Sequence, residues 1–85
     1  MSYSRWGYSR WYIFPSVEGR VEVWRAGDAP LCWAPGEGYA DFLERARASL
    51  THDGAFDEDF AEMRRILERS MPDIQQCFSA WRSGK

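Results

Sequence analysis

The spacing of the apolar residues changes once along this chain, at the segment Pro35-Gly36-Glu37-Gly38. Before this segment, apolar side chains alternate with period two, which is typical of β-strands. After it they recur at i, i+3, i+4 and i+7, which is typical of helices that bury one face. We therefore predict an α+β fold, in which a three-stranded antiparallel meander is followed by two or three helices packed on one face. A chain of 85 residues is expected to form a single domain over residues 1–85.

The sheet is expected within residues 10–34, with strands at 10–15, 20–25 and 31–33. Gly19 lies in the first turn, where a glycine can adopt a positive φ. Side chains alternate between the two faces of a strand, so one face should pack on the helices. The residues expected on that face are Trp11, Ile13, Val21 and Val23. The residues expected on the opposite face are Tyr12, Phe14 and Trp24.

The helices are expected within residues 39–83. The first should end before Gly54, which can adopt a left-handed conformation. The second should begin at Asp57, whose carboxylate can cap it, with further acidic residues at the positive end of the helix dipole. The third should run from about residue 73 to residue 82.

Residues 1–9 are expected to form an extended arm rich in aromatic side chains. Something must cover the second face of the sheet, because large exposed apolar patches usually mark contacts. In one interpretation Trp6 and Tyr8 fold back over Tyr12 and Trp24. In another, these four aromatic residues contact a partner protein, or the face is buried between two copies of the chain.

The segment from residue 53 to residue 62 carries five acidic residues and no basic one, namely Asp53, Asp57, Glu58, Asp59 and Glu62. One interpretation is a solvated helix start. The other is a surface that meets an arginine- and lysine-rich site on a partner, where carboxylates can imitate nucleic-acid phosphates. The second interpretation predicts that reversing the charge of Asp57, Glu58 and Asp59 abolishes binding without unfolding the domain.

The overall charge argues against direct binding of nucleic acid. The formal net charge is −2, whereas free-standing nucleic-acid binders are usually basic, since neutralising phosphates supplies much of their affinity. Arg5, Arg10 and Arg25 do interleave with aromatic residues, an arrangement that can stack single-stranded bases. A nucleic-acid-binding regulator therefore remains the least favoured alternative.

We find no pattern typical of an enzyme. The single histidine, His52, lies in an expected loop, and Cys32 and Cys77 belong to no metal-binding or catalytic motif. We expect reduced thiols, no cofactor and no metal. No apolar run approaches the roughly 18 residues that span a membrane, and no apolar signal core is present, so we expect a cytoplasmic protein.

The opening of the chain resembles small phage and prophage proteins of undefined function. Those begin Ser-Arg-Trp-Ser-x-Ser-x-Trp-Tyr-x-Phe, and the matching residues here are Ser4, Arg5, Trp6, Ser9, Trp11, Tyr12 and Phe14. Gly7 replaces the usual serine, and no resemblance extends beyond Pro15. The resemblance implies a mobile-element origin. Small proteins of this class are often non-enzymatic binders of host machinery, including inhibitors of CRISPR–Cas defence.

These observations together predict a non-enzymatic protein of the bacterial cytoplasm that binds and blocks a host complex. The expected partner is a host protein with a basic surface, with a CRISPR–Cas subunit as one candidate. The acidic residues would occupy a nucleic-acid-binding site on it. The protein is expected to be a monomer or a homodimer. The alternatives are a structural or homo-oligomeric accessory protein and the nucleic-acid-binding regulator.

Overall fold

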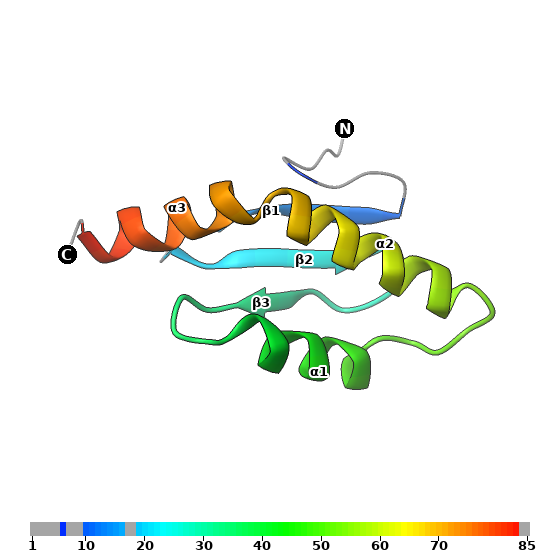
Figure 1. Ribbon diagram of the computed structural model, residues 1–85. Helices are drawn as coiled ribbons and strands as arrows, with labels where there is room; N and C mark the ends of the chain where they lie inside the picture. Colours follow the sequence, from blue (N-terminus) through cyan, green and yellow to red (C-terminus); the bar gives the residue numbers. More distant parts are fainter. Residues whose placement is uncertain (1–5, 7–9, 17–18, 84–85) are drawn as a thin grey trace.

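The sheet and the helices form in the predicted order in a computed structural model, which describes residues 6, 10–16 and 19–83 (Figure 1). The elements are β1 (Trp11–Pro15), β2 (Val21–Arg25), β3 (Leu31–Trp33), α1 (Tyr39–Ser49), α2 (Phe56–Arg69) and α3 (Met71–Ser83). The three strands pair antiparallel in the order β1-β2-β3. The prediction of an α+β fold with a three-stranded meander is confirmed, with three helices.

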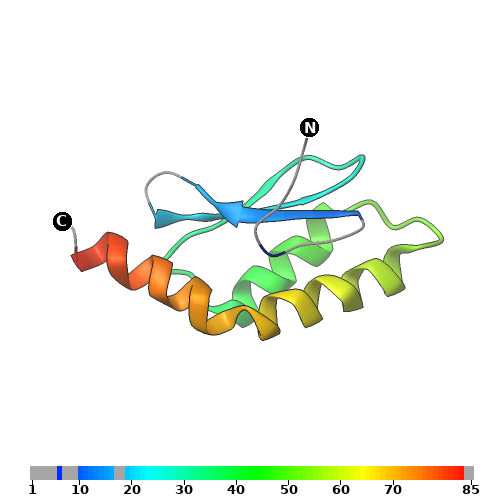
Figure 2. The ribbon, with the colours of Figure 1, turned by 90° about the horizontal axis from the view of Figure 1, so that it is seen from above.

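One face of the sheet carries the core, as the alternation predicts. Ile13 lies opposite Val23, and Val23 lies opposite Leu31. All three are buried, together with Trp11 and Val21. The helices lie on this same side of the strands in Figure 2. Their contributions to the core are Phe42 and Ala46 from α1, Phe56, Phe60, Met63, Ile66 and Leu67 from α2, and Ile74 and Phe78 from α3.

Trp33 joins the last strand to the helical layer. Its ring stacks on Phe42 at 5.3 Å between centroids and meets Phe78 edge-on at 5.2 Å. Its indole N–H donates a hydrogen bond of 2.7 Å to the backbone carbonyl of Glu37. A buried tryptophan needs such an acceptor for its polar atom. Trp33 therefore fixes both the start of α1 and the position of α3 against β3.

Groups outside the sheet contact both of its edge strands. The backbone N–H of Trp6 donates to the carbonyl of Ile13 in β1 at 3.1 Å. The guanidinium of Arg45 donates to the carbonyl of Cys32 in β3. Edge strands with unpaired polar groups invite pairing with other chains. These two contacts reduce that tendency at either side of the meander.

The structure corrects the predicted helix boundaries. Gly54 does not end α1 in a left-handed conformation, because the helix ends at Ser49 and Leu50 is extended at φ −80° and ψ 152°. Asp57 does not cap α2, which begins one residue earlier, at Phe56. The carboxylate of Asp53 instead accepts a hydrogen bond of 3.0 Å from the Ala55 N–H, so a turn upstream of the expected cap leads into the helix.

The third helix also begins earlier than predicted. The N–H of Ile74 donates to the carbonyl of Ser70 at 3.0 Å, so α3 follows α2 after a single residue. Pro72 lies in its first turn, where a missing backbone N–H does no harm. Within the described residues, no helix is long and apolar enough to cross a membrane.

Candidate interaction surfaces and a buried charge cluster

The most unusual residue of the core is Arg25, which is only 2% exposed. It ends β2 opposite Trp11 and shares the inward face of the sheet with Val21 and Val23. Strand alternation places it there, since residues 21, 23 and 25 point the same way. A guanidinium at such a site must be surrounded by opposite charge, because an unpaired buried charge is strongly destabilising.

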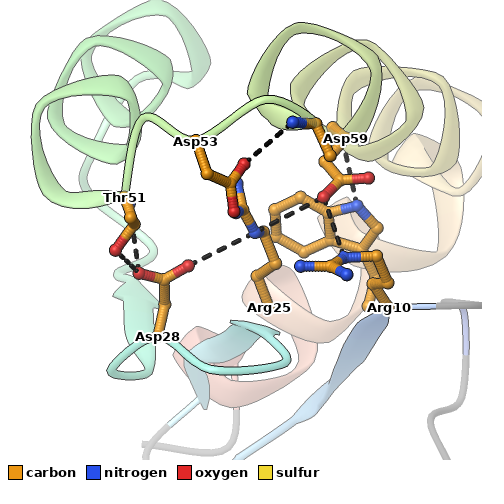
Figure 3. Close-up of polar contacts among 8 residues, drawn as sticks. Arg10, Arg25, Asp28, Thr51, Asp53 and Asp59 are labelled. Carbon is orange, nitrogen blue, oxygen red and sulfur yellow. Dashed lines mark hydrogen bonds and ion pairs between the residues drawn. The ribbon is translucent and has the colours of Figure 1, made fainter.

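Three aspartates supply that charge (Figure 3). The shortest contact joins Arg25 Nη2 to Asp53 Oδ2 at 2.6 Å. Arg25 Nε lies 3.3 Å from Asp28 Oδ2 and 3.4 Å from Asp59 Oδ2. Asp28 comes from the β2–β3 turn, Asp53 from the α1–α2 connection and Asp59 from α2. Arg25 therefore gathers three segments that are distant in the sequence.

Further contacts extend this arrangement. Arg10 Nε lies 2.9 Å from Asp59 Oδ2, and the Trp11 indole donates to the backbone carbonyl of Asp59 at 3.0 Å. Thr51 donates to Asp28 through its hydroxyl at 2.5 Å and its backbone N–H at 3.1 Å. We call the five charged residues the Arg25 cluster; they are Arg10, Arg25, Asp28, Asp53 and Asp59.

The Arg25 cluster is stabilised mainly by the attraction between opposite charges, because several of its polar atoms lack well-aligned hydrogen bonds to the described residues. Arg25 Nε, Arg25 Nη1 and Asp59 Oδ2 are buried without a well-aligned hydrogen bond to any described residue, although ion-pair distances link Nε and Oδ2. Desolvation alone would raise the pKa of the Asp53 carboxyl. Hydrogen bonds from the Ala55 N–H and from Arg25 outweigh it, so the pKa is lowered from its usual value. The Asp53 carboxylate is thereby favoured in its charged form.

Two of the five acidic residues between positions 53 and 62, Asp53 and Asp59, belong to the Arg25 cluster, and the other three do not. Asp59 is 6% exposed and paired with two arginines, so the expectation that all five acids form one open surface is wrong. We now expect charge reversal at Asp59 to destabilise the fold, since a lysine there would place a third cation beside Arg10 and Arg25. Asp53 is exposed but bound to Arg25.

Three members of the segment stay available on the first half of α2. Asp57 and Glu58 are exposed and Glu62 is half-buried. No ion pair connects any of them to another residue within the described ranges. We call these three residues the α2 acidic surface.

Among the four aromatic residues expected to contact a partner, those that the structure describes differ in how accessible they are. Trp6 is 8% exposed and belongs to the buried core cluster, so it is not available as a surface anchor. Tyr8 lies outside the described residues. Tyr12 is half-buried, and Trp24 is 37% exposed. Tyr12 and Trp24 are paired across β1 and β2, on the face that points away from the helices.

This outer face is a small aromatic platform with one carboxylate. The rings of Phe14 and Trp24 are 6.3 Å apart at an angle of 42°. The Trp24 indole donates a hydrogen bond of 2.9 Å to Glu22 Oε1. None of the three helices lies on this side of the sheet in Figure 2. We call Tyr12, Phe14, Glu22 and Trp24 the outer sheet face.

The α2 acidic surface and the outer sheet face therefore lie on different sides of the molecule. Helix α2 packs its buried residues, among them Met63 and Leu67, against the inward face of the sheet. Exposed residues of α2 consequently point away from the strands. A single flat partner surface cannot cover both sets of candidates at once.

The histidine and the two cysteines lie on different elements of the fold. The His52 ring stacks on Phe56 at 3.9 Å, and its Nε2 lies 2.9 Å from the carbonyl oxygen of Arg47. Cys32 lies on β3 and Cys77 on α3, both as free thiols. In the part of the chain that the structure describes, no group of three or more histidine, cysteine or acidic side chains could hold a metal ion.

The chain was compared with known proteins at the level of families, sequences and structures. No family model matches it. No curated protein and no solved structure matches it either. What the surfaces do must therefore be argued from their own chemistry.

Proposed function

We propose that this protein is a small non-enzymatic interaction protein that binds a basic surface of a partner protein through the α2 acidic surface. One observation carries the proposal: Asp57, Glu58 and Glu62 have no counter-ion among the described residues, whereas Asp53 and Asp59 in the same segment are held by Arg25. Unpaired carboxylates on one helix produce a negative potential that steers a basic partner.

The partner we propose is a bacterial host complex that binds nucleic acid, with a CRISPR–Cas subunit as the specific candidate. Carboxylates spaced along a helix can occupy arginine and lysine side chains that would otherwise contact phosphates. The resemblance of the opening residues to phage proteins supports the same assignment. The mechanism is steric and electrostatic occlusion in the bacterial cytoplasm, with no bond made or broken.

The test compares two triple variants with the same change in net charge. The first carries Asp57→Lys, Glu58→Lys and Glu62→Lys. The control carries Asp41→Lys, Glu44→Lys and Asp73→Lys, which replaces exposed acids on α1 and α3. Asp59 is left unchanged in both, because it belongs to the Arg25 cluster. Circular dichroism checks that both variants fold.

Binding and inhibition are then measured with purified CRISPR–Cas effector complexes, by nucleic-acid cleavage and by titration of the labelled protein. We expect wild type and control to bind and inhibit, and the first variant to lose both activities. An equal loss of binding and inhibition in both triple variants would show that net charge, and not the α2 acidic surface, causes the effect. Retained inhibition by the folded first variant would remove the α2 acidic surface from the mechanism.

A further inference from the structure

We infer that the outer sheet face is a docking site for an arginine side chain of a partner polypeptide. The guanidinium would lie against the Trp24 ring and pair with the Glu22 carboxylate. This site is separate from the α2 acidic surface and does not depend on the function proposed for it.

The aromatic part of the site is already oriented. Trp24 is exposed, yet its indole is held by the hydrogen bond of 2.9 Å to Glu22 Oε1. Phe14 lies beside it with a centroid distance of 6.3 Å. A ring that is fixed before binding loses little conformational entropy when a ligand stacks on it. Exposed, oriented tryptophan is also the best ring for a cation–π contact.

Within the described ranges, the charged part of the site has no counter-ion. Glu22 is half-buried on β2, and no ion pair links it to any residue within the described ranges. Its only described hydrogen bond uses one carboxylate oxygen, for Trp24. A carboxylate beside an aromatic surface is complementary to a cation, and arginine fits best because it is planar and can stack and donate in the same plane.

The helix layer shows the same combination with its arginine in place. Arg45 lies over the Phe42 ring at 5.4 Å and donates to both oxygens of Glu37, at 2.8 and 3.0 Å. Ring, carboxylate and guanidinium thus form a complete set there. On the outer sheet face, no ion pair or cation–π contact within the described ranges places a guanidinium on Glu22 or Trp24. A partner's arginine would complete the set.

Charge also distinguishes between classes of occupant. Aromatic rings on a sheet can stack nucleic-acid bases, but Glu22 would repel the adjoining phosphates. The two edge contacts, from Trp6 to Ile13 and from Arg45 to Cys32, oppose the addition of a further strand from another chain. A polypeptide that presents an arginine across the face meets neither obstacle.

The test uses the full chain and two capped peptides of glycine and serine, one with a central arginine and one with citrulline in its place. Citrulline keeps the shape of arginine and removes its charge. Binding is followed by the indole N–H signals in two-dimensional NMR, with the Trp24 signal assigned from Trp24→Phe. We expect the arginine peptide to shift the Trp24 signal and the citrulline peptide to bind about tenfold more weakly.

Matched variants separate the outer sheet face from the α2 acidic surface. Glu22→Gln should weaken the arginine peptide to the level of citrulline. Glu58→Gln removes the same charge from α2 and should leave the response of Trp24 unchanged, so failure of either proposal can be recognised without the other.

Several outcomes would overturn the inference. Equal binding of both peptides, or equal effects of Glu22→Gln and Glu58→Gln, would show that no specific arginine site exists. A concentration-dependent dimer in light scattering that Trp24→Ala abolishes would assign the face to a second copy. Nuclear Overhauser contacts from Trp24 to residues before Trp6 would assign it to the protein's own chain. A stronger response to a single-stranded oligonucleotide would assign it to nucleic acid.

Discussion

At the scale of single residues, Arg25 is the clearest case of a side chain that decides how distant segments meet. Its guanidinium is buried, and its three aspartate partners come from a turn, a loop and a helix. Burying ions is costly, and hydrophobic replacements are often as stable. The physical role we assign to Arg25 is therefore to fix the positions of these segments, because only one arrangement brings three carboxylates to one cation.

Replacing Arg25 with methionine should lower the free energy of unfolding by about 3 kcal/mol, the lower end for loss of one partner of a buried pair. The lower end applies because Asp59 would keep Arg10, and Asp28 would keep Thr51. Urea unfolding followed by tryptophan fluorescence measures the change.

Arg64→Met is the matched control. Arg64 Nε lies 3.6 Å from Glu68 Oε2, and the side chain is half exposed, so its loss should change the free energy of unfolding by less than about 0.5 kcal/mol. A similar decrease in the free energy of unfolding in the two variants would show that the Arg25 cluster contributes no more to stability than an exposed ion pair.

A second prediction at this scale concerns Tyr39. Burial and the hydrogen bond of its hydroxyl to Glu68 raise its pKa from 10 to about 12. Between these values the folded chain holds a proton that the unfolded chain has lost, so the stability contributed by Tyr39 falls as the pH rises from 10 to about 12.

The tyrosinate absorbance of the folded protein should accordingly contain a late step from Tyr39 near pH 12. Tyr39→Phe should remove that step and reduce the alkaline loss of stability. A late step that survives Tyr39→Phe would disprove the assignment.

At the scale of elements, the β2–β3 turn depends on one glycine. Gly27 has a φ of +94°, and the N–H of Asp28 donates to the carbonyl of Arg25 at 2.9 Å, which closes the turn. The turn brings Asp28 back to the guanidinium of the residue three positions before it. A residue with a Cβ rarely adopts this φ.

Gly27→Ala should therefore lower the free energy of unfolding by about 1–2 kcal/mol, the cost of a left-handed conformation for a non-glycine residue. No atom lies within 4 Å of the added Cβ, so the loss comes from the backbone and not from a clash. Gly36→Ala is the control, since its Cβ is also unobstructed and its φ is not positive. The midpoint temperatures of thermal unfolding are measured for both variants. Equal midpoints would contradict the proposed dependence of the turn on Gly27.

The elements also show how far periodicity predicts this fold. The strand alternation correctly separated Ile13 and Val23 from Tyr12 and Trp24, because a meander buries one face of each strand. The start of α2 was missed because the Asp53 turn depends on local hydrogen bonds that compete with the expected cap at Asp57. Helix ends are decided by such small local differences.

The Arg25 cluster was missed for a different reason. Arg25 occupies an inward strand position, and Asp59 occupies an inward helical position between Phe56 and Met63. Two opposite charges on predicted core faces are a sequence signal for a buried pair. The pattern cannot say that this end of β2 meets this turn of α2, which depends on how the helices cross the sheet.

At the scale of the whole molecule, one sheet separates two chemically different sides. The helices lie on one side of the sheet (Figure 2). The α2 acidic surface belongs to this helical side, and strand alternation places the outer sheet face on the other side. Neither surface shares a residue or a described contact with the other. Sites without shared partners usually contribute additively. The two proposed sites can therefore be occupied at the same time.

Independence of the two surfaces gives the last prediction. An oligolysine peptide should shift backbone signals of Asp57 and Glu58, and the single-arginine peptide should shift the Trp24 indole signal, with each response unchanged by saturation with the other peptide. At about 0.15 M salt the Debye length is about 8 Å, so charges on opposite sides are screened from each other. Glu22→Gln should weaken only the arginine response, and the triple lysine variant of the α2 acidic surface should abolish only the oligolysine response. Competition between the peptides, or loss of both responses in either folded variant, would mean that the two surfaces form one site.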